Sequence, residues 1–213
     1  MVLVRFYHRR QKILIVDGGK FDDLTNVFIF EQGVHKARSF IKEQHQSISH
    51  YAVITVDIDM MKSINHSYDY DFGDLFLRSF AHSLDKIFGS IGIITRVRRN
   101  DFVIFIAVNS ETEVISLIEQ IHGQLDNLVI GKHRPNATCS VGFSCFNMKS
   151  YDKTSDLCTH LVGQASIALR YSKSSGGNKW TKYDKDLASK ITIANHYLDD
   201  DDDDQTDIYF QPF

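Results

Sequence analysis

The stretch from Val53 to Asp74 constrains the fold of this chain more than any other. An apolar run ends there abruptly in two carboxylates, Asp57 and Asp59, and a lysine, an asparagine and a Gly-Asp pair follow soon after. Mg²⁺ prefers oxygen ligands and is usually bound by one or two carboxylates together with substrate phosphates. A buried strand that ends in carboxylates therefore indicates a sheet edge able to hold a metal ion and a nucleotide.

Several residues of this stretch have a possible role in such a site. Asp57 and the carbonyl of Ile58 stand at the strand end and are candidate metal ligands. Asp59 would share the face of Asp57 if the strand continued. Asn65 and Asp74 are candidates to read a guanine edge, because a carboxylate accepts two N–H groups together and an amide supplies a donor and an acceptor. Capping of helix ends is the alternative role for these two residues.

Two lysines are candidates to contact phosphates. Lys62 follows the strand end closely, and Lys173 lies far downstream in a predicted helix. A solvated surface position is the alternative for both, because most lysines are exposed.

Apolar periodicity outlines the rest of the fold. Helical spacing predicts helices, and short apolar runs bounded by turn residues predict strands. One predicted helix starts near residue 22, and three others span residues 71–87, 110–125 and 155–174. The predicted strands are 51–56, 91–97, 102–108, 138–146 and 180–183. Ser110 is the expected N-cap of the third helix. Helices packed on a mostly antiparallel sheet make an α+β sandwich of the ferredoxin-like, split-βαβ kind.

Length and composition limit the function classes. A chain of 213 residues with a formal charge of −3 can bury a good core, and no basic stripe with interleaved aromatic residues indicates nucleic-acid binding. No apolar run approaches the roughly 20 residues that span a bilayer, so no membrane contact is expected from this segment. Cys139, Cys145 and Cys158 show no metal-ligand spacing, which favours free buried thiols in a reducing cytoplasm.

The composition changes after Tyr183. Residues 1–21 are an expected lead-in, and residues 22–184 form the expected domain. Residues 185–206 are predicted to be a linker with a helical start, and it ends in a run of aspartates that repel one another. Residues 207–213 turn strand-like again, which suggests a boundary inside a larger protein.

Residues from Asp22 to Tyr183 resemble the GGDEF domain of diguanylate cyclases. The anchors are DDLT at 22–25, DIDMMKSIN at 57–65, Gly73-Asp74, the S-x-G triplet at 140–142 and ASIALRYSKSSGGN at 165–178. Several anchors in the right order and spacing are far more specific than a lone motif. The resemblance implies a nucleotidyl-cyclase sandwich, in which two GTP-loaded copies face each other as a homodimer and use Mg²⁺ to form cyclic di-GMP.

The resemblance also implies a role for each candidate residue. It assigns metal ligation to Asp57 and the Ile58 carbonyl, guanine contacts to Asn65 and Asp74, and phosphate contacts to Lys62 and Lys173.

The signature hairpin departs from the family pattern. G-G-[DE]-E-F falls on Arg98-Arg99-Asn100-Asp101-Phe102, so arginines replace glycines that allow a close approach to phosphates or a positive φ. Asn100 replaces the acid implied as a metal ligand and as help in activating the hydroxyl. A neutral amide is a weak Mg²⁺ ligand and takes no proton. Strand alternation directs the adjacent Asp101 to the other face, so Asp101 is expected to be a poor substitute.

Other positions also differ from the pattern. His66 stands for an acid, Asp69-Tyr70 replaces Gly-His, and Gly177 replaces an arginine that would contact phosphate. The family's product-inhibition motif, R-x-x-D, would fall on Gly89 and Gly92, so no such site is expected.

The last residues, IYFQPF at 208–213, resemble the opening strand of EAL phosphodiesterase domains. This resemblance implies that the parent protein joins a GGDEF-like domain to an EAL domain. The catalytic glutamate and metal ligands of that second domain would lie beyond Phe213.

The leading hypothesis is a catalytically degenerate GGDEF domain that binds GTP or dimerises and regulates an attached EAL domain. Two alternatives stay open. The intact carboxylates at the strand end favour a weakly active diguanylate cyclase. A purely structural interaction domain, whose pocket binds nothing, is the third reading.

Overall fold

The computed structural model describes residues 19–152 and 156–187. The helices described are α1 (Phe30–Gln44), α2 (Met61–Ser67), α3 (Tyr70–Phe88), α4 (Glu111–Asp126) and α5 (Leu157–Ser174), with one 3₁₀ turn at Met148–Ser150. The strands are β1 (Phe28–Ile29), β2 (His50–Ile58), β3 (Gly92–Arg96), β4 (Asp101–Val108), β5 (Cys139–Asn147) and β6 (Trp180–Lys182). The predicted linker helix, acidic run and EAL-like strand fall largely or wholly outside the described residues.

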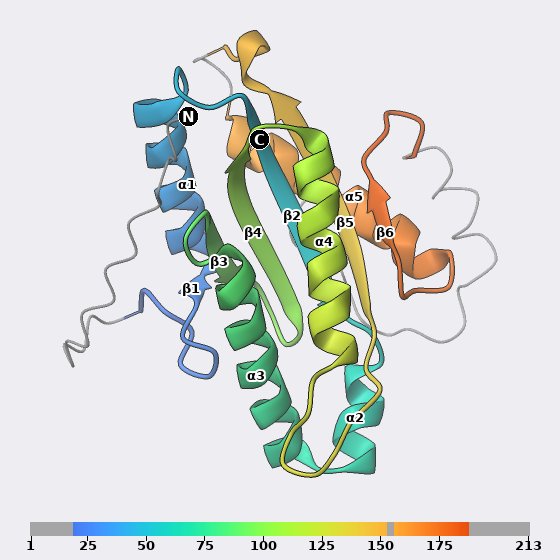
Figure 1. The fold of residues 1–213 in the computed structure, drawn as a ribbon. Helices are drawn as coiled ribbons and strands as arrows, with labels where there is room; N and C mark the ends of the chain where they lie inside the picture. Colours follow the sequence, from blue (N-terminus) through green and yellow to red (C-terminus); the bar gives the residue numbers. More distant parts are fainter. Residues whose placement is uncertain (1–18, 153–155, 188–213) are drawn as a thin grey trace.

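A single mixed sheet forms the centre of the described fold (Figure 1). Its order is β1-β3-β4-β2-β5-β6, and β4 and β5 both run antiparallel to β2. The edge strands β1 and β6 pair in parallel with their neighbours. The predicted α+β class is confirmed. Because β2 is flanked on both sides and is buried from Tyr51 to Ile58, its polar end lies in the middle of one end of the sheet.

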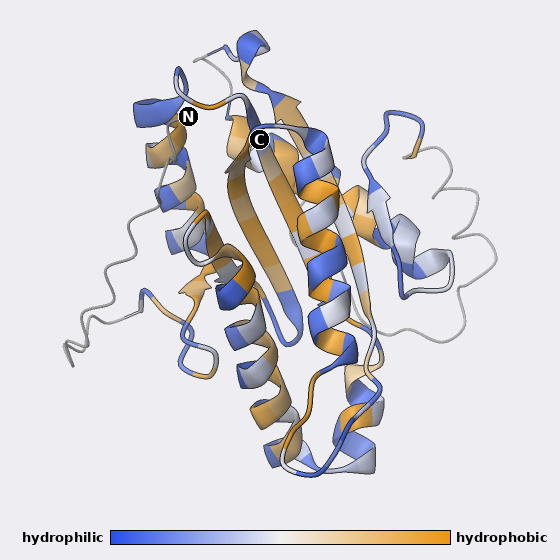
Figure 2. Ribbon diagram, in the orientation of Figure 1, coloured by the Kyte–Doolittle hydropathy of each residue, from blue (hydrophilic) through white to orange (hydrophobic). Residues whose placement is uncertain are grey.

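Helices cover both faces of the sheet, and strand alternation decides which residues meet which helices. On β2 and β4, even-numbered residues such as Ile54 and Ile104 pack in the core of α2, α3 and α4, whereas odd-numbered residues such as Val53 and Val103 pack with α1 and α5. Figure 2 shows the central strands as hydrophobic and the helices with hydrophilic residues along one side. Asp57, an odd-numbered residue, therefore belongs to the face of α1 and α5.

The predicted helices and strands are confirmed apart from shifts at their ends, and Ser110 caps α4 by accepting a hydrogen bond from Glu113. Helix α1 is a larger exception, because it begins at Phe30 and not near Asp22. Asp22 instead closes a turn with Thr25, and Asn26 leaves that turn with a φ of 57°. Sequence periodicity predicted neither β1 nor α2, which are too short for it to detect.

Helix α5 lies very close to β5 because Gly142 has no side chain. A Cβ at this position would lie 2.1 Å from the Leu169 nitrogen and 2.2 Å from the Ala165 oxygen. The buried hydroxyl of Thr55, on β2, lies 3.1 Å from the Gly142 carbonyl and 3.0 Å from the Ala165 carbonyl. This close approach carries the last turn of α5, with Lys173, to the end of β2.

All three cysteines are free thiols, as predicted. Burial raises the pKa of Cys145 to about 11 and the pKa of Cys158 to about 12, and it raises the pKa of Cys139 further. These thiols are therefore protonated and unreactive at neutral pH. In the part of the chain that the structure describes, no helix combines the length and the apolar character needed to cross a bilayer.

Candidate functional site

The polar end of β2 meets the hairpin between β3 and β4. The antiparallel register places Asp57 opposite Asp101, and paired residues project to the same face of a sheet. The prediction that Asp101 points away from the site was therefore wrong. That prediction counted alternation from Asn100, but Asn100 precedes β4 and lies outside the ladder. Pairing with β2 sets the face, and both carboxyls lie on the side of α5.

Asp57, Asp101 and Lys173 form a compact charge group. The Asp57 side chain is 6% exposed, and its Oδ2 lies 2.9 Å from the Lys173 Nζ. Burial, then the hydrogen bond and charge of Asp101, raise the pKa of Asp57 to about 8, and Lys173 opposes this rise. Burial lowers the pKa of Lys173, but the charge of Asp57 outweighs it and the net shift is upward. The raised pKa keeps a proton on Asp57 to a higher pH than on an ordinary carboxyl, and the Lys173 ammonium lies against this group.

Asn100 turns its side chain toward the backbone of Ile58. The side-chain Nδ2 of Asn100 donates a hydrogen bond of 2.8 Å to the Ile58 carbonyl. The backbone carbonyl of Asn100 accepts a hydrogen bond from the Ile58 N–H at 3.4 Å. Both backbone polar groups of Ile58 are therefore engaged by one residue. The carbonyl that the resemblance assigns to a metal ion instead accepts an N–H.

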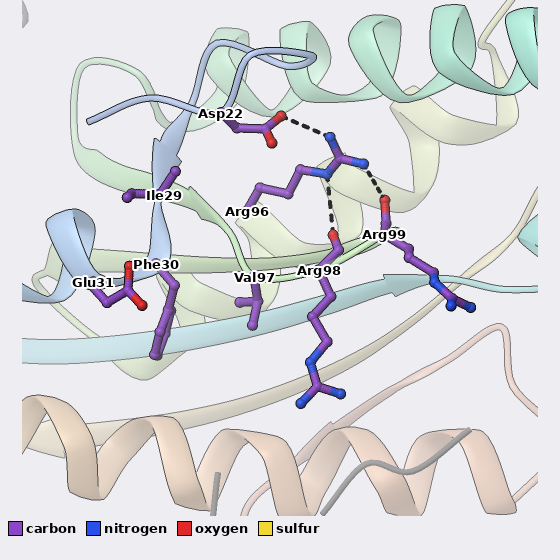
Figure 3. A pocket seen from close by; sticks show the side chains of 8 residues that line it. All are labelled: Asp22, Ile29, Phe30, Glu31, Arg96, Val97, Arg98 and Arg99. Atoms are coloured by element: carbon purple, nitrogen blue, oxygen red, sulfur yellow. Dashed lines mark hydrogen bonds and ion pairs between the residues drawn. The ribbon is translucent and has the colours of Figure 1, made fainter. Parts of the chain in front are cut away.

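The two arginines of the hairpin do not need the conformations that glycine favours. Neither Arg98 nor Arg99 has a positive φ, so their side chains cause no backbone strain. Arg96 holds the turn in place. Its Nε and Nη2 donate to the carbonyls of Arg98 and Arg99 at 3.2 and 2.6 Å, and its Nη1 lies 2.8 Å from Asp22 (Figure 3).

This arrangement lines a hollow of about 400 Å³ beside the start of α1. Figure 3 shows the side chains of Arg98 and Arg99 extending away from the hairpin in different directions. Sequence reasoning missed the role of Arg96. The signal was an arginine placed just before the hairpin in a chain whose entry turn carries a carboxylate.

Asp59 belongs to the framework and not to the reactive group. Its carboxylate accepts hydrogen bonds from the hydroxyls of Thr138 and Ser140, both at 2.7 Å, and from the backbone N–H of Asn178 at 3.0 Å. It therefore joins the end of β2 to β5 and to the turn between α5 and β6. Gly177, in the same turn, has a φ of 68° and packs against this carboxylate.

The other predicted contacts gather where α2 meets α3. Asn65 Oδ1 is buried and is among the few such atoms in the described residues without a hydrogen-bond partner. It fits closely against Gly73, because a Cβ there would lie 1.9 Å from this oxygen. Asp74 is exposed on α3. Lys62 is exposed on α2 and, with His66, helps to line a shallow hollow of about 350 Å³.

The predicted residues thus fall into two groups. We call Asp57, Ile58, Asn100, Asp101 and Lys173 the strand-end cluster, and Lys62, Asn65, Gly73 and Asp74 the helix corner. In the strand-end cluster, Asp57 contacts Lys173 and Asp101, and Asn100 donates to the Ile58 carbonyl, while the buried Oδ1 of Asp101 has no hydrogen-bond partner among the described residues. The helix corner holds an exposed carboxylate on α3, an exposed ammonium on α2 and an amide oxygen that is buried without a partner.

The strand-end cluster as arranged does not fit a divalent cation. Among the described residues, no three His, Cys, Asp or Glu side chains gather so that they could hold a metal ion. Asp57 and Asp101 offer carboxylate oxygens, but Asp57 is paired with Lys173 and the Ile58 carbonyl accepts from Asn100. Mg²⁺ requires these oxygens to face the ion and not an N–H donor.

Comparison with known proteins gives one family. The family model described as "Diguanylate cyclase, GGDEF domain" matches residues 20–179. The probable diguanylate cyclase DgcF of Escherichia coli is 29% identical over 162 residues, which is 75% of this chain and 33% or 50% of the relative's length in two strains. The chain therefore spans half or less of the length of these relatives.

Two further matches extend the comparison. The cyclic di-GMP phosphodiesterase NbdA of Pseudomonas aeruginosa is 23% identical over 166 residues, which is 76% of this chain and 21% of that protein. Among solved structures, the GGDEF domain of DgcB from Caulobacter crescentus, in complex with c-di-GMP, superimposes with a TM-score of 0.66 at 19% identity. That match covers 78% of this chain and 96% of the other. It supports the fold alone.

Proposed function

The chain belongs to the GGDEF family of diguanylate cyclase domains, and from this premise we propose that it binds GTP without condensing it. It acts as a regulatory module in cyclic di-GMP signalling in the cytoplasm. Binding changes how the domain pairs with a second copy or with an attached EAL domain. In this proposal GTP acts as the signal, and the domain does not convert it to cyclic di-GMP.

The observation that carries this proposal is the side chain of Asn100. It stands at the acid position of the signature hairpin and donates to the Ile58 carbonyl at 2.8 Å. Condensation of GTP requires a 3′-hydroxyl to lose its proton, and an amide cannot accept one. Asp101 does not stand at that position, because it is the first residue of β4 and pairs with Asp57 on the face of α5.

Nucleotide binding is supported by the helix corner. The Asp74 carboxylate is able to accept from the N1–H and the exocyclic amine of guanine together. Asn65 has a buried oxygen without a partner, and Gly73 makes the space for it. An unsatisfied buried polar atom costs roughly 1–3 kcal/mol, so a site that keeps one is expected to use it. Lys62 supplies an exposed positive charge nearby for the phosphates.

The signalling setting is supported by the relatives. NbdA is by name a cyclic di-GMP phosphodiesterase, and this chain matches 21% of its length. A domain of this kind therefore occurs inside a protein that degrades cyclic di-GMP. This agrees with the proposed attachment to an EAL domain, for which the sequence IYFQPF at 208–213 is the motivating feature.

The proposal is tested by two measurements on the purified chain. Calorimetric titration should show binding of GTP and weaker binding of ATP, because adenine lacks the donors that Asp74 would accept from. Incubation with GTP and Mg²⁺, followed by chromatography, should yield no cyclic di-GMP. Light scattering with and without GTP reports whether two copies pair. Absence of GTP binding at millimolar nucleotide would refute the proposal.

A slow diguanylate cyclase is the second candidate, because one observation favours it. Asp57 on β2 and Asp101 on the adjacent strand β4 are paired in the ladder, so two carboxylates remain at the strand end. Formation of cyclic di-GMP by the wild-type chain and its loss in Asp57→Ala would establish this candidate over the first. Product that persists in Asp57→Ala would point to a contaminating enzyme.

A further inference from the structure

We infer that the amide of Asn100 and the ammonium of Lys173 take the place of the divalent cation in this domain. Guanine nucleotide therefore binds to it without a metal ion. The nucleotide part of this inference rests on the proposed function, whereas the metal part stands on the contacts of the strand-end cluster alone.

The first step of the argument concerns the Ile58 carbonyl. A carboxylate at position 100 would bring negative oxygens toward this carbonyl, and the two would repel unless a cation lay between them. Asn100 instead brings an N–H and closes the gap with a hydrogen bond of 2.8 Å. The Ile58 carbonyl already accepts a hydrogen bond within the protein, so a cation could bind to this oxygen only after that hydrogen bond is broken.

The second step concerns charge. Asp57 and Asp101 lie opposite each other, and an acid at position 100 would add a third negative group beside them. Three carboxylates need a strong counter-charge, which a divalent cation supplies. With Asn100 in that position no third carboxylate is present, and the Lys173 ammonium lies 2.9 Å from Asp57 as its counter-charge. The substitution therefore removes both the repulsion that recruits a cation and a ligand that would hold it.

The third step concerns the nucleotide. GTP usually brings Mg²⁺ on its phosphates, and the protein normally holds that ion with carboxylates. Here Asp57 is paired with Lys173 and the Ile58 carbonyl with Asn100, and positive charge at the helix corner comes from Lys62. The affinity for GTP should therefore be nearly the same with Mg²⁺ and with a chelator.

The decisive experiment compares the wild-type chain with Asn100→Asp, using Mn²⁺ alone as the spin probe. At submillimolar Mn²⁺ concentration, the wild-type chain should leave the electron paramagnetic resonance signal of free Mn²⁺ unchanged. Asn100→Asp should bind Mn²⁺ and gain thermal stability from it, by about 5 °C in the melting midpoint, because the ion binds only the folded state. Circular dichroism in the presence of Mn²⁺ confirms that this variant is folded.

Two control variants separate the acid from the lost amide and from added charge. Asn100→Ala removes the hydrogen bond without adding an acid, and it should not bind Mn²⁺. Asn136→Asp makes the same chemical change at an exposed position, and it should behave as wild type. Mn²⁺ binding by wild type that disappears in Asp57→Asn would overturn the inference, and so would an Asn100→Asp variant that is folded but binds no Mn²⁺.

The nucleotide part is measured by titrating GTP in Mg²⁺ and in a chelator. Wild-type affinity should differ by less than about threefold, whereas Asn100→Asp should bind at least about tenfold more tightly with Mg²⁺, a gain of 1.4 kcal/mol. A tenfold loss of wild-type affinity in chelator would overturn the inference and leave the proposed function intact. If GTP binds in neither buffer, the proposed function fails, and the Mn²⁺ experiment alone decides the inference.

Discussion

The helix corner matches the family pattern at all four positions, whereas the strand-end cluster carries Asn100 at the acid position, and the two regions also differ in what their residues are free to do. In the helix corner, Asp74 is exposed and the buried oxygen of Asn65 has no partner among the described residues. In the strand-end cluster, Asp57 is paired with Lys173 and the Ile58 carbonyl is paired with Asn100. The helix corner thus presents an exposed carboxylate, whereas in the strand-end cluster Asp57 and the Ile58 carbonyl are paired inside the protein and only the buried Oδ1 of Asp101 lacks a partner among the described residues.

This difference teaches that a retained residue is not always an available one. Asp57 is present as the family pattern requires, but its side chain is 6% exposed and its charge is balanced inside the protein. Residues of the helix corner should therefore affect binding more than folding. Residues that build the strand-end cluster should affect folding more than binding. Four substitutions test this division.

The largest effect on stability is expected from Gly142→Ala. Its Cβ would meet backbone atoms of α5 at 2.1 and 2.2 Å, and the helix must move away from the sheet. We expect a loss of about 3 kcal/mol in the free energy of unfolding, measured by urea denaturation. Because Lys173 moves with α5, the contact with Asp57 should weaken, while GTP affinity changes little. A comparable loss of GTP affinity would show that the two regions are coupled.

Asp22→Asn is expected to cost about 2 kcal/mol at neutral pH, because the Asp22 carboxylate accepts from Thr25 and pairs with Arg96. Burial alone would raise the pKa of Asp22, but these hydrogen bonds outweigh it and hold the pKa below its ordinary value of 3.8. The contribution of the Asp22 carboxylate to the free energy of unfolding is therefore fully present above pH 3.8, and it is lost as the pH falls below that value through the lowered pKa.

Melting curves from neutral pH down through that window check this expectation. The difference between wild type and Asp22→Asn should shrink as the pH falls through the window. A difference that stays constant with pH would mean that the charge of Asp22 does not matter.

Gly73→Ala should reverse the pattern and affect binding more than folding. The new Cβ collides with the end of the Asn65 side chain at 1.9 Å, and this flexible side chain can rotate away. We expect less than about 1 kcal/mol of lost stability but a loss of at least about tenfold in GTP affinity, or 1.4 kcal/mol.

Gly123→Ala on α4 is the matched control for Gly73→Ala, because a Cβ added at Gly123 would have no heavy atom of another part of the protein within 4 Å. It should keep full GTP affinity and gain up to about 1 kcal/mol of helix stability. An unchanged GTP affinity in Gly73→Ala would count against the helix corner as the nucleotide site.

The smallest effect on stability is expected from Asp74→Asn, within about 0.5 kcal/mol, because this side chain is exposed. Its effect on selectivity should be clear, since an amide cannot accept both guanine N–H groups as a carboxylate does. Competition between GTP and ATP in the calorimeter measures this, and the preference for GTP should fall. A preserved preference would place guanine recognition elsewhere.

Much of the fold was predictable because its long elements carry strong periodicity. β2 and α3 were found within a few residues of their ends, and the cap at Ser110 was correct. The start of α1 was not found, because a turn held by Asp22 replaces the helix that periodicity suggested. Long-range contacts of a polar side chain leave no periodic trace.

The candidate site was predictable in composition and not in arrangement. The sequence places Asp57 at the end of its strand and Asp74 in the first turns of its helix, as in the structure, whereas the short helix that carries Asn65 was not predicted. It does not reveal the face of Asp101, because that face depends on pairing with β2 and not on counting from Asn100. Nor does it reveal that Asn100 turns to the Ile58 carbonyl, since a rotamer is chosen by the neighbours it meets in three dimensions.

The three hydrogen bonds to Asp59 bear on how such a domain changes over evolutionary time. They fix β2 to β5 and to the turn after α5 without using any residue of the signature hairpin. Substitutions at Arg98, Arg99 and Asn100 therefore leave the framework in place. The hairpin is therefore free to vary in sequence while the domain keeps its fold, so the demands of folding and the demands on the hairpin act on different residues.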